Sequence, residues 1–73
     1  MIEPDDLPLM ANTRMPFGRF KDTVLIDLPE EYLLWFVDRG FPSGRLGELM
    51  KITLEVKING LESLIKPLRH DGD

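Results

Sequence analysis

The chain has 73 residues, with nine lysines and arginines, thirteen aspartates and glutamates, and no cysteine. This length allows one small domain, and the lack of cysteine excludes a disulfide framework, a zinc–thiolate site and a thiol nucleophile. No run of 18 apolar residues is present, which excludes a membrane-spanning helix. The acidic first residues lack the apolar stretch of a signal peptide, so we expect a cytoplasmic protein that does not bind a membrane.

The acidic residues are concentrated near the two ends of the chain. Five of the thirteen lie there, which leaves eight acids against nine bases between Arg14 and Arg69. Nucleic-acid-binding proteins usually carry a basic field. The neutral central part therefore disfavours strong, charge-driven binding of nucleic acid and leaves room for a local basic patch.

Residues 1–13 contain two prolines and three acids and show no hydrophobic period, which predicts an extended N-terminal arm. A single domain is expected over 14–68, followed by a polar C-terminal tail over 69–73. Within the domain, residues 15–26 are predicted to form a β-hairpin with its turn at Lys21 and Asp22, because 23–26 are apolar and mostly β-branched. Pro16 would confine the first strand to a sheet edge.

Residues 29–39 carry consistent helix signals. Pro29 suits a first helical turn, Glu30 and Glu31 suit the positive end of the helix dipole, and Arg39 with Gly40 suits a helix C-terminus. Pro42 and Gly44 then indicate a linker over 40–45.

Residues 46–66 fit two templates. Residues 52–58 alternate with period two and precede Asn59-Gly60, which is typical of a strand and a hairpin turn. The apolar residues of 46–65 also recur at three- and four-residue spacings. We predict a long helix over 44–66 that Gly60 kinks or divides, and the choice between helix and strand at 50–60 stays open. The fold class expected is α+β: one small domain with an N-terminal β-hairpin packed on two to three helices.

The sequence offers little for catalysis. His70 is the only imidazole and lies in the tail, and no serine lies in a nucleophile motif. Glu30 and Glu31 are accounted for by their helix start, and no glycine-rich phosphate loop is present. We therefore predict a protein that is not an enzyme and has no catalytic residue, metal site or cofactor.

Aromatic and basic residues alternate around a glycine in residues 16–21. Single-stranded nucleic acid is often held by aromatic faces that stack bases and by cations that meet phosphates. This pattern makes nucleic acid a candidate partner, although both phenylalanines of the segment could instead pack in the core. The candidate nucleic-acid-binding residues are Arg14, Phe17, Arg19, Lys21, Arg39 and Arg45.

Residues 32–37 are six consecutive apolar residues, which point around most of a helix. Some of them should meet a second surface, in the same chain or in a protein partner such as a second copy. The candidate interface residues are Leu34, Trp35 and Phe36, with a core role for Trp35 as the alternative.

These residues resemble a known family. The segments MPFGRFK at 15–21, LPEEYLLWF at 28–36, GFP at 40–42, Leu46-Gly47 and EVKINGLE at 55–62 are similar to a small bacterial family called "putative quorum-sensing-regulated virulence factor". The resemblance covers about residues 14–68 and implies no biochemical activity.

The first half is also similar to a C-terminal module of exodeoxyribonuclease X-like proteins, which implies a nucleic-acid-associated accessory role. The matching positions are Phe17, Gly18, Arg19, Phe20, Lys21, Pro29, Tyr32 and Trp35. The acidic metal-binding motifs of the nuclease are absent, so no nuclease activity is implied. Asp22 stands where the family usually has glycine, and it places a negative charge beside Lys21. The function expected is a non-catalytic accessory module that binds nucleic acid through residues 17–21, with protein interaction or homodimerisation through helix 29–39 as the alternative.

Overall fold

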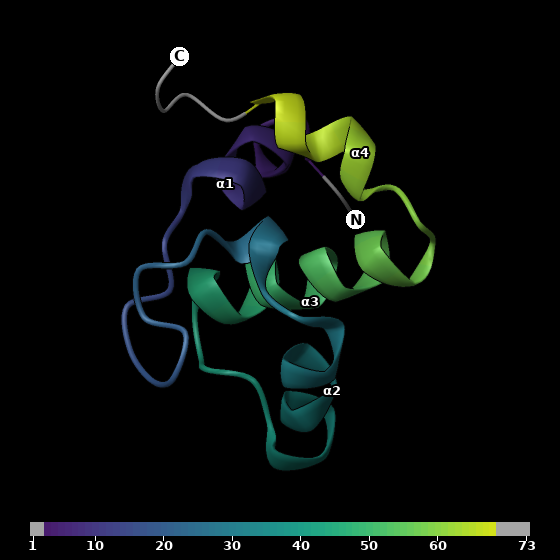
Figure 1. Ribbon diagram of the computed structural model, residues 1–73. Helices are drawn as coiled ribbons and strands as arrows, with labels where there is room; N and C mark the ends of the chain where they lie inside the picture. Colours follow the sequence, from purple (N-terminus) through teal and green to yellow (C-terminus); the bar gives the residue numbers. More distant parts are fainter. Residues whose placement is uncertain (1–2, 69–73) are drawn as a thin grey trace.

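A computed structural model describes residues 3–68, and these form an all-helical domain (Figure 1). In chain order the elements are α1 (Asp6–Asn12), the 3-10 turn η1 (Leu25–Asp27), α2 (Glu30–Arg39), α3 (Arg45–Ile58), α4 (Glu62–Ile65) and the 3-10 turn η2 (Lys66–Leu68). No strand occurs in residues 3–68, so the predicted α+β class is wrong. No helix within this range has the length and apolar character needed to cross a membrane.

The predicted β-hairpin over 15–26 is replaced by a loop. A single antiparallel bridge joins Arg14 to Val24, and the Met15 N–H donates to the Thr23 carbonyl at 2.8 Å. The pairing stops there because Pro16 has no N–H to donate and Asp22, at φ 73°, turns the chain back at once. Residues 24–26 are apolar, a composition that is typical of a buried strand. In this structure they are buried against helices instead.

Residues 1–13, predicted as an extended arm, contain helix α1 instead. Pro8 is the third residue of this helix, where the missing N–H breaks no helical hydrogen bond. Met10 and Ala11 are fully buried in a cluster with Ile26 and Val56, so α1 belongs to the core. The amide of Asn12 also donates to the Leu68 carbonyl at 3.1 Å, which joins α1 to η2.

The helix predicted over 29–39 is confirmed as α2, which follows Pro29 and ends at Gly40 with φ 95°. The open question at 50–60 is settled in favour of helix, since α3 runs to Ile58. The predicted division at Gly60 is also found: the chain turns there, with φ 70°, before α4 begins.

The core has two parts. One lies between α2 and α3 and is built on Leu33, Phe36, Leu49 and Met50. The other joins α1, η1, α3 and α4 around Met10 and Ile26. Figure 1 shows that α2 lies at the end of the molecule opposite α1 and α4. The loop of residues 17–20 contacts one side of α2.

Candidate functional site

An open groove of about 740 Å³ lies between the loop of residues 17–20 and α2. It is mainly apolar and takes in every aromatic residue of the chain except Phe41. We call it the aromatic groove. Its lining residues are Phe17, Gly18, Arg19, Phe20, Pro29, Glu31, Tyr32, Trp35 and Phe36.

The rings of the groove hold one another edge to face. The Tyr32 ring centroid lies 4.7 Å from that of Phe20 and 5.2 Å from that of Phe36, and the Trp35 centroid lies 5.1 Å from that of Phe36. Such pairs add to the stability gained by burial. Phe36 is buried, whereas Phe17 is 43% exposed and Trp35 is 49% exposed. The groove thus has a fixed aromatic base and two rings that remain accessible to a ligand.

Gly18 lets the loop approach α2 closely. Its φ is 81°, a conformation that residues with a side chain rarely adopt, and an added Cβ would lie 3.1 Å from the Tyr32 hydroxyl oxygen. Gly18 therefore permits this turn of the loop and its close approach to the Tyr32 hydroxyl.

Two arginine side chains lie over rings of the groove. The guanidinium carbon of Arg39 lies 4.3 Å from the Trp35 ring centroid, and that of Arg19 lies 5.7 Å from the Phe20 ring centroid. A guanidinium stacked on a ring keeps its N–H donors directed outward in its own plane. Both groups are therefore held where they can meet an anion at the edge of the groove.

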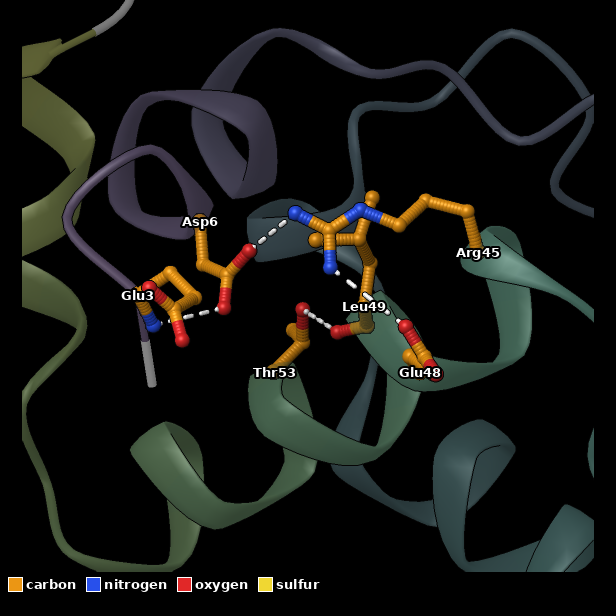
Figure 2. Close-up of polar contacts among 6 residues, drawn as sticks. All are labelled: Glu3, Asp6, Arg45, Glu48, Leu49 and Thr53. Carbon is orange, nitrogen blue, oxygen red and sulfur yellow. Dashed lines mark hydrogen bonds and ion pairs between the residues drawn. The ribbon is translucent and has the colours of Figure 1, made fainter. Parts of the chain in front are cut away.

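Other candidate residues have different roles. Arg14 donates to the Asp22 carbonyl at 2.7 Å and so braces the base of the loop. Lys21 is exposed on the loop but does not line the groove. Arg45 pairs with Asp6 and, at 3.4 Å, with Glu48 (Figure 2).

The Asp6–Arg45 pair joins α1 to the start of α3. Asp6 is 1% exposed and accepts a hydrogen bond from the Glu3 N–H at 2.9 Å. This backbone hydrogen bond, and after it the Arg45 guanidinium, lowers the pKa of the Asp6 carboxyl, although burial acts in the opposite direction. The same pairing raises the pKa of Arg45. Arg45 therefore serves to hold α1 against α3 in this structure.

The three candidate interface residues do not share one environment. Phe36 is only 8% exposed and packs in the core, whereas Leu34 is 44% exposed on the outer side of α2. Val37, one turn after Leu34, is 56% exposed. Trp35 lines the groove and is thus shared between the two candidate sites.

The structure therefore brings Phe17, Arg19, Trp35 and Arg39 to one place and leaves Arg14 and Arg45 engaged elsewhere. Sequence reasoning missed Glu31 as a groove residue because the helix start already accounted for it. The four-residue spacing from Glu31 to Trp35 was the available signal, since residues so spaced share one helix face.

Comparison with known proteins confirms the resemblance to the small bacterial family. Residues 3–68 match the family described as "Putative quorum-sensing-regulated virulence factor". The chain is 56% identical over 69 residues to "Uncharacterized protein YpeB" of Escherichia coli strain K12 and, equally, to that of Escherichia coli O157:H7. Each alignment covers 93% of this chain and 96% of the relative. No solved structure matches the chain. The chain belongs to the family of putative quorum-sensing-regulated virulence factors.

Proposed function

We propose that this protein is a non-catalytic module that binds single-stranded nucleic acid in the aromatic groove. The observation that carries the proposal is that two half-exposed rings, Phe17 and Trp35, line one groove with Arg19, and that Arg39 lies over the Trp35 ring. Unpaired bases stack on such rings, and guanidinium groups beside them bind the phosphates. Paired bases hide their faces in the duplex, so a single strand is the form that this groove accepts.

The charge distribution sets the strength of the interaction. Within residues 3–68, Arg19 lines the groove, Arg39 lies over the Trp35 ring, and Lys21 is exposed on the adjoining loop. With three phosphates contacted, the logarithm of the binding constant falls with the logarithm of salt concentration at a slope of about −2 for single strands. We therefore expect moderate affinity and a shallow salt dependence, in keeping with the neutral central part of the chain.

Binding can be measured by the fluorescence anisotropy of labelled 15-nucleotide single strands of DNA and RNA, with the emission of Trp35 as a second signal. Phe17→Ala and Trp35→Ala should each weaken binding by about 5-fold or more, since a base stacked on an aromatic ring contributes about 1–3 kcal/mol. The double variant Arg19→Ala/Lys21→Ala should weaken binding and make the salt slope shallower.

Matched controls are available at the other end of the molecule. Lys66→Ala removes a cation from η2, and Leu64→Ala removes an apolar side chain that is 66% exposed on α4. Both should leave the affinity unchanged. If the Arg19→Ala/Lys21→Ala variant binds like the unmodified protein, or if no single strand binds at low salt, the proposal is wrong.

The second candidate is homodimerisation through the outer side of α2. It is favoured by the exposure of Leu34 and Val37, which lie one turn apart beside Trp35. Trp at the edge of an apolar surface is common in protein interfaces. Sedimentation should then show a dimer at high protein concentration, and Leu34→Asp should make it a monomer. A monomer at every concentration would rule out this candidate.

A further inference from the structure

Three side chains form a stripe along α2 beside the aromatic groove. Glu31, Trp35 and Arg39 are spaced four residues apart, so they lie one above the other on the same face of the helix. Glu31 and Trp35 both line the groove, and the Arg39 guanidinium lies over the Trp35 ring. The stripe thus presents an acceptor, an aromatic platform and a cation in that order.

We propose that Glu31 makes the groove selective for guanine in single-stranded nucleic acid. The inference rests on the proposed function and goes beyond it, because it names the base and the residue that selects it. In the proposed complex Arg39 binds the phosphate of a base stacked on Trp35. The Watson–Crick edge of that base then faces Glu31, which lies one turn from Trp35 in the opposite direction along α2. Single-stranded nucleic acids are recognised through this edge when their bases are unstacked.

The Glu31 carboxylate is available for this role. It is exposed, and no salt bridge or hydrogen bond with another side chain in residues 3–68 engages it. An ionised carboxylate only accepts hydrogen bonds, through two oxygens. It therefore favours a base edge that offers two donors side by side and disfavours an edge on which an acceptor faces it.

Guanine is the base that offers such an edge. Its N1–H and its N2 amino group are adjacent donors, which match the two oxygens of a carboxylate. Adenine and cytosine each place a ring-nitrogen acceptor next to their amino group, and thymine flanks its single N–H with two carbonyl oxygens. A carboxylate facing any of these edges gains at most one hydrogen bond and meets a lone pair that repels it.

The test compares 15-nucleotide thymine strands that carry one central guanine, adenine, cytosine or hypoxanthine. Guanine should bind about 5-fold or more tightly than adenine or cytosine, the lower end of the discrimination given by a bidentate pair. Hypoxanthine lacks the N2 amino group and should fall between them. Glu31→Gln should abolish the guanine preference without weakening the binding of the all-thymine strand.

Glu30→Gln is the matched control. Glu30 is also exposed in the first turn of α2, yet it does not line the groove. The Glu30→Gln variant removes one negative charge from the same turn of α2 as Glu31→Gln, so both variants would share a purely electrostatic effect. The guanine preference should survive in Glu30→Gln.

The outcomes separate the two proposals. Equal binding of all four strands, or a guanine preference that persists in Glu31→Gln, overturns the role of Glu31 and leaves single-strand binding standing. No binding of any strand removes the proposed function and the inference with it. Guanosine monophosphate binding as tightly as the guanine strand would identify a free nucleotide as the ligand and overturn the single-strand assignment.

Discussion

Replacing Gly47 by alanine is expected to destabilise the protein, although Gly47 lies inside α3, where alanine is the better helix former. A Cβ built on Gly47 would lie 1.7 Å from the Pro42 carbonyl oxygen and 2.9 Å from its carbonyl carbon. Real Cβ atoms essentially never come closer than 3.0 Å to a non-bonded heavy atom of this kind. The helix and the 40–44 connection must therefore separate by roughly 1.3 Å in the variant.

The connection resists this movement. The Phe41 ring stacks on Phe36 with centroids 5.7 Å apart and planes at 23°, and Phe36 lies in the core between α2 and α3. The atom in the way is backbone, so no rotamer change relieves the clash. Overpacking of this kind lowers the free energy of unfolding by about 3 kcal/mol, the upper end of its usual range. The higher helix propensity of alanine relative to glycine raises it by about 1 kcal/mol. The net destabilisation should be about 2 kcal/mol.

Urea unfolding followed by circular dichroism at 222 nm measures the free energy difference, and thermal unfolding should show Tm lowered by roughly 8–16 °C. Glu55→Ala, an exposed change in the same helix, is the control and should shift the free energy of unfolding by less than about 0.5 kcal/mol. If the Gly47→Ala protein is as stable as the parent, or more stable, then helix propensity outweighs the clash with the Pro42 carbonyl, and this account of Gly47 is wrong.

Three further changes test other parts of the structure. Leu33→Ala empties a fully buried position between α2 and α3 and should cost about 2–5 kcal/mol in urea unfolding, a large share of the stability of so small a domain. Asp6→Asn should destabilise the protein at pH 7. The folded pKa of Asp6 lies below its ordinary value of 3.8, so the ionised carboxylate stabilises the folded protein above that pH and this stabilisation is lost as the pH falls. The free energies of unfolding of the parent and the Asp6→Asn variant should therefore converge in acid. Asp22→Gly relieves the positive φ of 73° and should stabilise the loop by a few tenths of a kcal/mol, after the greater chain entropy of glycine is subtracted; a loss of stability would contradict this account of the turn.

The candidate site was partly visible in the sequence. Phe17, Arg19 and Trp35 could be singled out because their residue types suit stacking and phosphate binding wherever they lie. Their assembly into one groove depends on the contact of Phe20 with Tyr32, two residues in different segments of the chain. The engagement of Arg45 by Asp6 could not be foreseen either, because it joins residues 39 positions apart.

The sequence by itself determined α2 and the break at Gly60, and it favoured the helix α3 without excluding a strand at 50–60. Their signals are local: a proline and two glutamates at one end of a helix, an arginine and a glycine at the other, and apolar residues at helical spacing. Only the tertiary structure decided that residues 6–12 form a helix and that residues 15–26 do not form a hairpin. A seven-residue helix is marginal in water until Met10 and Ala11 are buried against distant residues such as Val56. Residues 24–26 are apolar enough for a strand, but strand pairing needs a partner. The pairing ends after Met15, because Pro16 has no N–H to donate and the chain turns at Asp22.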